Sequence, residues 1–167
     1  MTREGTALTT TVIAIMLGGA IFGFFYAWVC STMWGLDNAD PRASIEAMQA
    51  MNASVRNAVF FPAFFLTPVV MAIAGFLARG VSTRAFVLLV AAAVLYLVGT
   101  LMVTGTINVP MNEDLANVTS PASVEEARTV WDDSSSRWQV FNQLRTAASG
   151  GSLLLAVLGL VALARGF

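Results

Sequence analysis

Residues 8–36 read LTTTVIAIMLGGAIFGFFYAWVCSTMWGL, an apolar run without one charged side chain. A helix that crosses the hydrocarbon core of a bilayer needs about 20 consecutive, mainly apolar residues. Three further uncharged runs meet this requirement, over residues 57–78, 85–107 and 146–164. The sequence therefore predicts four transmembrane helices.

The composition agrees with a bilayer as the solvent. Of the 167 residues, 57% are hydrophobic and only 11% are charged, whereas about a quarter are charged in a soluble domain. The net charge is −1 and no basic run occurs, which argues against a nucleic-acid partner. The first apolar run exceeds the roughly 7–15 residues of a signal peptide, so it is expected to be retained. We predict one all-α domain over residues 1–167, an integral membrane four-helix bundle.

The charges predict an orientation, because cytoplasmic segments are enriched in arginine and lysine. One side of the predicted bundle carries four arginines and one glutamate, and the other carries nine acidic residues and five arginines. We expect a multi-pass protein of the cell membrane with both termini in the cytoplasm. Segments 37–56 and 113–145 should then form a helical extracytoplasmic cap. All nine basic residues are arginine, which favours a GC-rich bacterial source.

Local signals predict where the cap helices begin. Asp40-Pro41 is a typical helix start, and we expect this helix to continue into the second span until Pro62 and Pro68 bend it. Pro110 should end the third span, because proline disfavours helix at the residue before it. Ser120-Pro121 and the capping box Ser123-x-x-Glu126 both mark the start of the last helix. With no further proline up to Ala164, that helix would be on the order of 60 Å long.

Polar residues near the outer ends of the spans require an explanation, because unpaired polar groups are costly inside a membrane. On the last helix, the spacing places five such residues on one face: Trp131, Trp138, Asn142, Arg145 and Ser149. Asn108 and Asn112 leave the third span at a similar height, and Gln49 and Asn52 lie before the second. These groups could converge on one pocket. The alternative is that the tryptophans are interfacial anchors and the amides hydrogen-bond neighbouring helices.

The same stretches resemble a known family of membrane proteins, the anthrone oxygenase-like family, long catalogued as a domain of unknown function. Residues 48–52 (MQAMN), 103–112 (VTGTINVPMN) and 131–145 resemble three blocks of this family in the same order. The resemblance implies four transmembrane helices. It also implies that the chain is a possible oxidoreductase, since characterised members oxidise an anthrone to an anthraquinone with dioxygen and no metal or flavin.

Applied to this sequence, the resemblance suggests a role for each residue of the predicted pocket. Trp131 and Trp138 would stack on the flat rings, with Gln49 and Asn52 also binding the substrate. Arg145, Asn142, Asn108 and Asn112 would stabilise the oxyanion, as catalytic residues. The general base is left open among Asp132, Asp133, Glu113, Asp114 and a water molecule. No cofactor or metal is expected, because the chain has no histidine and a single cysteine, Cys30.

Three functions therefore stay open. The first is a cofactor-independent oxygenase acting on a lipophilic aromatic small molecule. The second is a lipid- or quinone-binding protein without catalysis, whose partners are membrane lipids. The third is an accessory subunit that packs against other membrane protein subunits. A pocket that reaches the Asn/Trp/Arg cluster from the lipid would favour the first two, whereas a cluster filled by its own side chains would favour the third.

Overall fold

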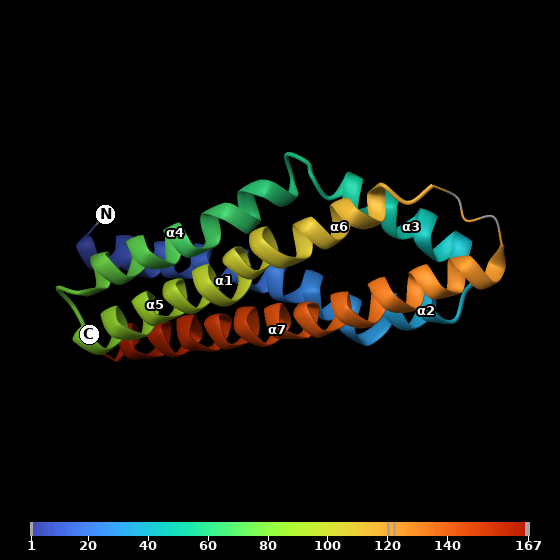
Figure 1. Cartoon of the computed structure of the whole chain (residues 1–167). Helices are drawn as coiled ribbons and strands as arrows, with labels where there is room; N and C mark the ends of the chain where they lie inside the picture. Colours follow the sequence, from blue (N-terminus) through green and yellow to red (C-terminus); the bar gives the residue numbers. More distant parts are fainter. Residues whose placement is uncertain (1, 120, 122, 166–167) are drawn as a thin grey trace.

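A computed structural model describes residues 2–119, 121 and 123–165 (Figure 1), and every regular element in this part of the chain is helical. The elements, with η denoting π-helix, are α1 (Arg3–Ala27), η1 (Trp28–Thr32), α2 (Met33–Asp37), α3 (Pro41–Ser54), α4 (Phe60–Ala78), α5 (Thr83–Tyr96), η2 (Leu97–Met102), η3 (Thr104–Asn108), α6 (Val109–Ala116) and α7 (Val124–Ala164).

These elements join into four helices that are long and apolar enough to cross a membrane: Arg3–Asp37, Phe60–Ala78, Thr83–Ala116 and Val124–Ala164. The chain is therefore a membrane protein, and the predicted all-α bundle is confirmed. Helix α1 packs on α4 and α7, and α5 packs on the same two helices, which closes a four-membered ring. Figure 1 shows both chain ends at one end of the bundle and α2, α3 and α6 at the other, where they form the helical cap around the first half of α7.

Small residues allow the helices to approach closely. The largest buried cluster is dominated by alanines contributed by all four long helices, among them Ala14, Ala74, Ala92 and Ala156. A Cβ added to Gly99 would lie 2.5 Å from the Cβ of Ala148, so the third long helix and α7 touch there with no room for a side chain. Such contacts replace the hydrophobic effect as the source of helix association in lipid.

The structure contradicts the expected continuous helix from Asp40 into the second span. Helix α3 ends at Ser54 and α4 begins at Phe60. Asn57 makes this break, because its amide nitrogen donates to the Ser54 carbonyl while its amide oxygen accepts from the backbone N–H groups of Val59 and Phe60. One side chain thus closes one helix and caps the next, a local alternative that asparagine offers the backbone.

The expectation that Pro110 ends the third helix is also wrong. The helix continues to Ala116, with Pro110 in the first turn of α6. The π-helical segment η3 lies immediately before it. Proline removes one N–H and crowds the carbonyl four residues earlier, and the wider π-turn relieves that conflict without ending the helix.

Other boundary predictions are confirmed. Asp40 caps α3 by accepting from the Arg42 N–H, and Ser123 caps α7 by accepting from the Glu126 N–H. Helix α7 then runs uninterrupted for 41 residues. The other predicted start signal, Ser120, lies outside the described residues.

The cap is fastened to α7 by the Asp37 carboxylate, which accepts from Trp131 Nε1 at 3.0 Å, Ser135 Oγ at 2.7 Å and Gln139 Nε2 at 2.9 Å.

Candidate functional site

A pocket of about 360 Å³ lies within the half of the bundle nearest the helical cap, and we call it the bundle pocket. All three π-helical segments of the described chain contribute to its wall, through Trp28, Leu101 and Thr104. π-Turns are rare and occur frequently at functional sites. The lining residues are Phe24, Phe25, Trp28, Met51, Asn52, Val55, Arg56, Phe60, Phe61, Phe64, Phe65, Leu101, Thr104, Gly105, Val109, Asn112, Trp138 and Arg145.

Arg145 is the central polar group of this pocket. Its side chain is 4% exposed, and its guanidinium donates to Asn142 Oδ1 at 3.0 Å and to Thr104 Oγ1 at 3.3 Å. The guanidinium carbon lies 4.5 Å from the ring centre of Phe25 and 5.2 Å from that of Trp138, within the range of cation–π attraction. No acidic side chain of the described residues forms an ion pair with it. A buried positive charge is therefore held by neutral groups alone.

Several buried side-chain polar atoms have no hydrogen-bond partner within the described part of the chain. They are Arg145 Nε, Asn52 Nδ2, Thr100 Oγ1 and both amide atoms of Asn108. Buried polar groups are nearly always paired, and each exception calls for an explanation. Of these residues, Asn52 and Arg145 line the bundle pocket. Unused hydrogen-bonding capacity is thus available to an occupant of the pocket.

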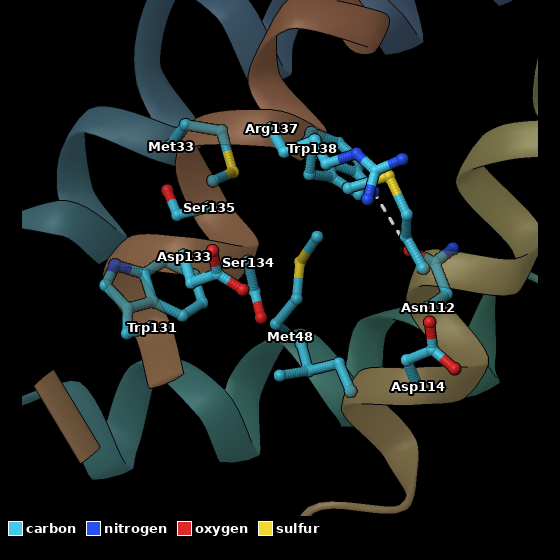
Figure 2. A pocket seen from close by; sticks show the side chains of 12 residues that line it. Met33, Met48, Asn112, Asp114, Trp131, Asp133, Ser134, Ser135, Arg137 and Trp138 are labelled. Carbon is cyan, nitrogen blue, oxygen red and sulfur yellow. Dashed lines mark hydrogen bonds between the residues drawn. The ribbon is translucent and has the colours of Figure 1, made fainter. Parts of the chain in front are cut away.

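A second, smaller cavity of about 110 Å³ lies between α7 and the cap helices, and we call it the cap cavity (Figure 2). Trp138 and Asn112 line both cavities, and Trp138 Nε1 donates to Asn112 Oδ1 at 2.9 Å. This pair forms a wall between the two. The wall is reinforced by Trp28, whose ring centre lies 5.1 Å from that of Trp138. The cap cavity is lined by Met33, Met48, Met111, Asn112, Asp114, Leu115, Trp131, Asp133, Ser134, Ser135, Arg137 and Trp138.

The structure brings together four of the eight residues proposed from sequence, namely Asn52, Asn112, Trp138 and Arg145, in the wall of the bundle pocket. Asn142 does not line the pocket. Its Oδ1 accepts from the Arg145 guanidinium, and its Nδ2 donates to the Phe25 carbonyl at 3.2 Å. Asn108 is fully buried and belongs to the lining of neither cavity.

Trp131 and Gln49 lie in the cap. Trp131 lines the cap cavity (Figure 2). Its Nε1 donates to Asp37. Gln49 donates to the Leu115 and Val118 carbonyls, which joins α3 to the end of α6. In this arrangement both residues hold the cap together, and neither lines the bundle pocket.

Sequence reasoning did not single out the aromatic wall from α1 and η1 or the hydroxyl of Thr104. Phe24, Phe25 and Trp28 lie within a run in which nearly every residue is apolar, so no periodicity marks an inward face. The available signal for Thr104 was its spacing of four from Thr100 and Asn108, a polar stripe in an otherwise apolar helix. Within the described residues, no group of three or more His, Cys, Asp or Glu side chains is arranged to hold a metal ion.

The fold and the site define a class: a membrane-embedded four-helix bundle with an aromatic pocket built around a buried arginine. The family described as "Anthrone oxygenase" matches residues 51–155, more than half of the chain, and the protein belongs to this family. The matched segment contains Asn52, Asn112, Trp138 and Arg145, whereas the α1 wall of the pocket lies before it. No curated protein and no solved structure matches the chain.

Proposed function

We propose that the protein binds a flat, lipophilic aromatic compound in the bundle pocket and oxidises it with dioxygen, as an anthrone is oxidised to an anthraquinone. The observation that carries this proposal is the buried guanidinium of Arg145, which has neutral and aromatic neighbours but no acidic partner among the described residues. An uncompensated buried charge is expensive. A substrate anion would supply the missing negative charge.

The aromatic lining suits a flat substrate. Phe24, Phe60 and Phe64 form part of the wall, and Trp28 and Trp138 line the end near Arg145. Stacked or edge-to-face ring contacts contribute roughly 0.5–1.5 kcal/mol each beyond the buried area. An aromatic ligand would therefore gain packing energy along the pocket and place its oxygen at the arginine.

Stabilising the anion is the chemical step that these residues would promote. Loss of a proton from the methylene carbon of an anthrone gives an electron-rich enolate, whose oxygen Arg145 would hold in a water-poor site. The carbon then forms a bond to dioxygen, giving a hydroperoxide after protonation. Loss of water converts this group to the second carbonyl, so anthrone and dioxygen yield anthraquinone and water.

The four carboxylates considered as proton acceptors lie away from the bundle pocket, and this favours a second candidate function. None of the four carboxylates considered from sequence lines the bundle pocket: Asp114 and Asp133 line the cap cavity, Asp132 is exposed, and Glu113 pairs with Arg56 at 3.5 Å. Catalysis would thus use water as the acceptor. A non-catalytic protein that binds a quinone or a lipid needs no acceptor, and the same pocket would serve it.

A role as an accessory subunit has weaker support. That role predicted a polar cluster filled by its own side chains, whereas here Arg145 faces a pocket of about 360 Å³. Pockets for small molecules typically measure about 300–1,000 Å³ and are mostly apolar with a few placed polar groups. The size and lining of the bundle pocket agree with that description.

The test is oxygen uptake by the purified protein in lipid nanodiscs supplied with anthrone, with anthraquinone formation followed by absorbance and autoxidation subtracted. We expect one dioxygen consumed per anthrone. Arg145→Met should lower the rate by about a hundredfold or more, the usual effect of losing an oxyanion donor. Arg145→Lys should recover little, because an ammonium cannot reproduce the planar, stacked fork.

Arg137→Met is the matched control, since Arg137 lies on α7 two turns earlier, is exposed and does not line the bundle pocket. It should react as wild type does. Anthrone binding without oxygen uptake would support the quinone- or lipid-binding function instead. Equal turnover by wild type and Arg145→Met would refute the assigned role of the arginine.

A further inference from the structure

The bundle pocket has an opening on the side of the bundle, between α4 and the third long helix. Phe61 and Phe65 on α4 line the pocket and are also 41% and 48% exposed. Across from them, Leu101 and Gly105 line the pocket, and Gly105 is exposed as well. We call these four residues the mouth. Three of them, Phe61, Phe65 and Gly105, belong both to the pocket wall and to the outer surface. Arg56 does so too on the cap side, where it is paired with Glu113.

The helix arrangement explains why the opening lies there. Helix α4 packs along α1 and α5 but only sparsely on η2. The π-helical segments η2 and η3 follow α5, and along them the third long helix makes few contacts with α4. The resulting gap is bordered by aromatic and aliphatic side chains of the mouth.

The surface around the mouth is apolar. Leu66, Val69, Val98 and Met102, on the same two helices, are each about half exposed. Side chains of this kind face lipid in a membrane-spanning helix. On the cap side, by contrast, Arg56 from the loop reaches Glu113 on α6 at 3.5 Å, which spans the gap with an ion pair. The mouth therefore opens toward hydrocarbon, and charged groups lie between it and the aqueous side.

Gly105 keeps the mouth open. A Cβ added to this residue would meet nothing within 4 Å, whereas one added to Gly75, Gly99 or Gly159 would contact a neighbouring helix at 3.0 Å or less. Gly105 is thus not needed for close helix packing. Its small size leaves space at the edge of the pocket.

From these observations we propose that the occupant of the bundle pocket enters and leaves sideways through this mouth, directly from the lipid. This inference rests on the proposed function for the class of occupant, a planar lipophile dissolved in the membrane. Water-borne delivery through the cap is the alternative. Lateral access would let a poorly soluble compound reach Arg145 without crossing the charged cap.

The experiment uses anthraquinone as the probe and quenching of the tryptophan fluorescence as the signal, with the full chain in lipid vesicles. Trp34→Phe is the background, because Trp34 is 65% exposed. The amount of lipid is raised until almost all of the anthraquinone is in the bilayer. The binding rate should then exceed the rate at which the remaining aqueous anthraquinone could arrive by diffusion, about 10⁹ M⁻¹s⁻¹ times its concentration. A rate below this limit overturns the proposal, and so does the absence of any binding.

Gly105→Leu should slow both association and release, on the order of tenfold, while the equilibrium affinity changes much less. The matched control is Gly23→Leu on α1, which is also exposed, also has open space around an added Cβ and does not line the pocket. Glu113→Gln, which removes the ion pair on the cap side, should leave the rates unchanged. Faster binding in Glu113→Gln would show that the occupant arrives through the cap.

The outcomes separate this inference from the proposed function. Anthraquinone binding faster than the aqueous diffusion limit, without oxygen uptake from anthrone, would retain the lateral mouth and reject the oxygenase. Turnover that depends on Arg145, together with binding slower than that limit, would retain the oxygenase and reject the mouth.

Discussion

At the scale of single residues, Pro68 shows how one missing donor is compensated by a distant side chain. Proline has no N–H, so the Phe64 carbonyl four residues earlier loses its helical partner. The Tyr96 hydroxyl, from α5, donates to this carbonyl at 3.0 Å, and both residues are buried. The bond fastens α4, one turn before Pro68, to the third long helix next to the bundle pocket, which Phe64 lines.

We therefore expect Tyr96→Phe to destabilise the protein, because the Phe64 carbonyl would remain buried without a donor. The expected loss is about 1–3 kcal/mol in the free energy of unfolding, measured by reversible denaturation in mixed micelles. Tyr26→Phe is the control, since Tyr26 is the other tyrosine of the chain and is 51% exposed. Similar stability of both variants would exclude this role of Tyr96.

The residue scale also shows why four of the eight residues singled out from sequence line the bundle pocket and four do not. Helical spacing identified the face of α7 that carries Trp131, Trp138 and Arg145, and all three are buried. Spacing does not by itself show which residues meet one ligand. Trp131 precedes Arg145 by four turns, about 20 Å along the axis, and so lies in the cap. Gln49 bonds to carbonyls at the end of α6, a contact between distant segments that no local pattern reveals.

At the scale of elements, prolines were poor guides to helix ends in this chain. Pro110 was expected to end a helix that in fact continues, whereas the break between α3 and α4 occurs before Pro62 and is made by Asn57. The rules on proline concern an α-helical backbone. They do not anticipate a π-turn such as η3, which changes the hydrogen-bonding pattern ahead of the proline.

Asn57→Ala should weaken the junction between α3 and α4, because the Ser54 carbonyl and two N–H groups at the start of α4 lose their partner. Loss of a capping side chain costs about 0.5–2 kcal/mol, measurable by thermal unfolding. Asn57→Asp keeps the acceptor for the N–H groups and loses only the donor, so it should be closer to wild type. If the alanine and aspartate variants are equally stable, Asn57 does not act as a cap.

At the scale of the whole molecule, the four spans were predictable because each needs only length and apolarity, and the structure has four helices that meet these criteria. Which helices pack against each other was harder to predict from the sequence. Close approach depends on single small residues such as Gly99 against Ala148, and these are ordinary members of an apolar run. The orientation of the bundle in the membrane stays a prediction from the distribution of charge.

That orientation predicts which cysteines can be labelled from outside intact cells with a membrane-impermeant maleimide. Thr83 and Ser136 are exposed and lie at opposite ends of the bundle, so we choose them for single substitutions in a Cys30→Ala background. Ser136→Cys should react, whereas Thr83→Cys should react only after the cells are opened. The reverse pattern would place both termini outside.

Helix α7 is one uninterrupted rod of 41 residues that is clamped by Asp37 in the cap and carries Arg145 in the pocket. In mechanical terms it is a lever. With no hinge in between, a tilt imposed at the cap is transmitted to the guanidinium and to the Trp138 ring together. A force applied outside the membrane, by a neighbouring protein or by tension in the bilayer, would therefore be expressed as a change in the shape of the bundle pocket.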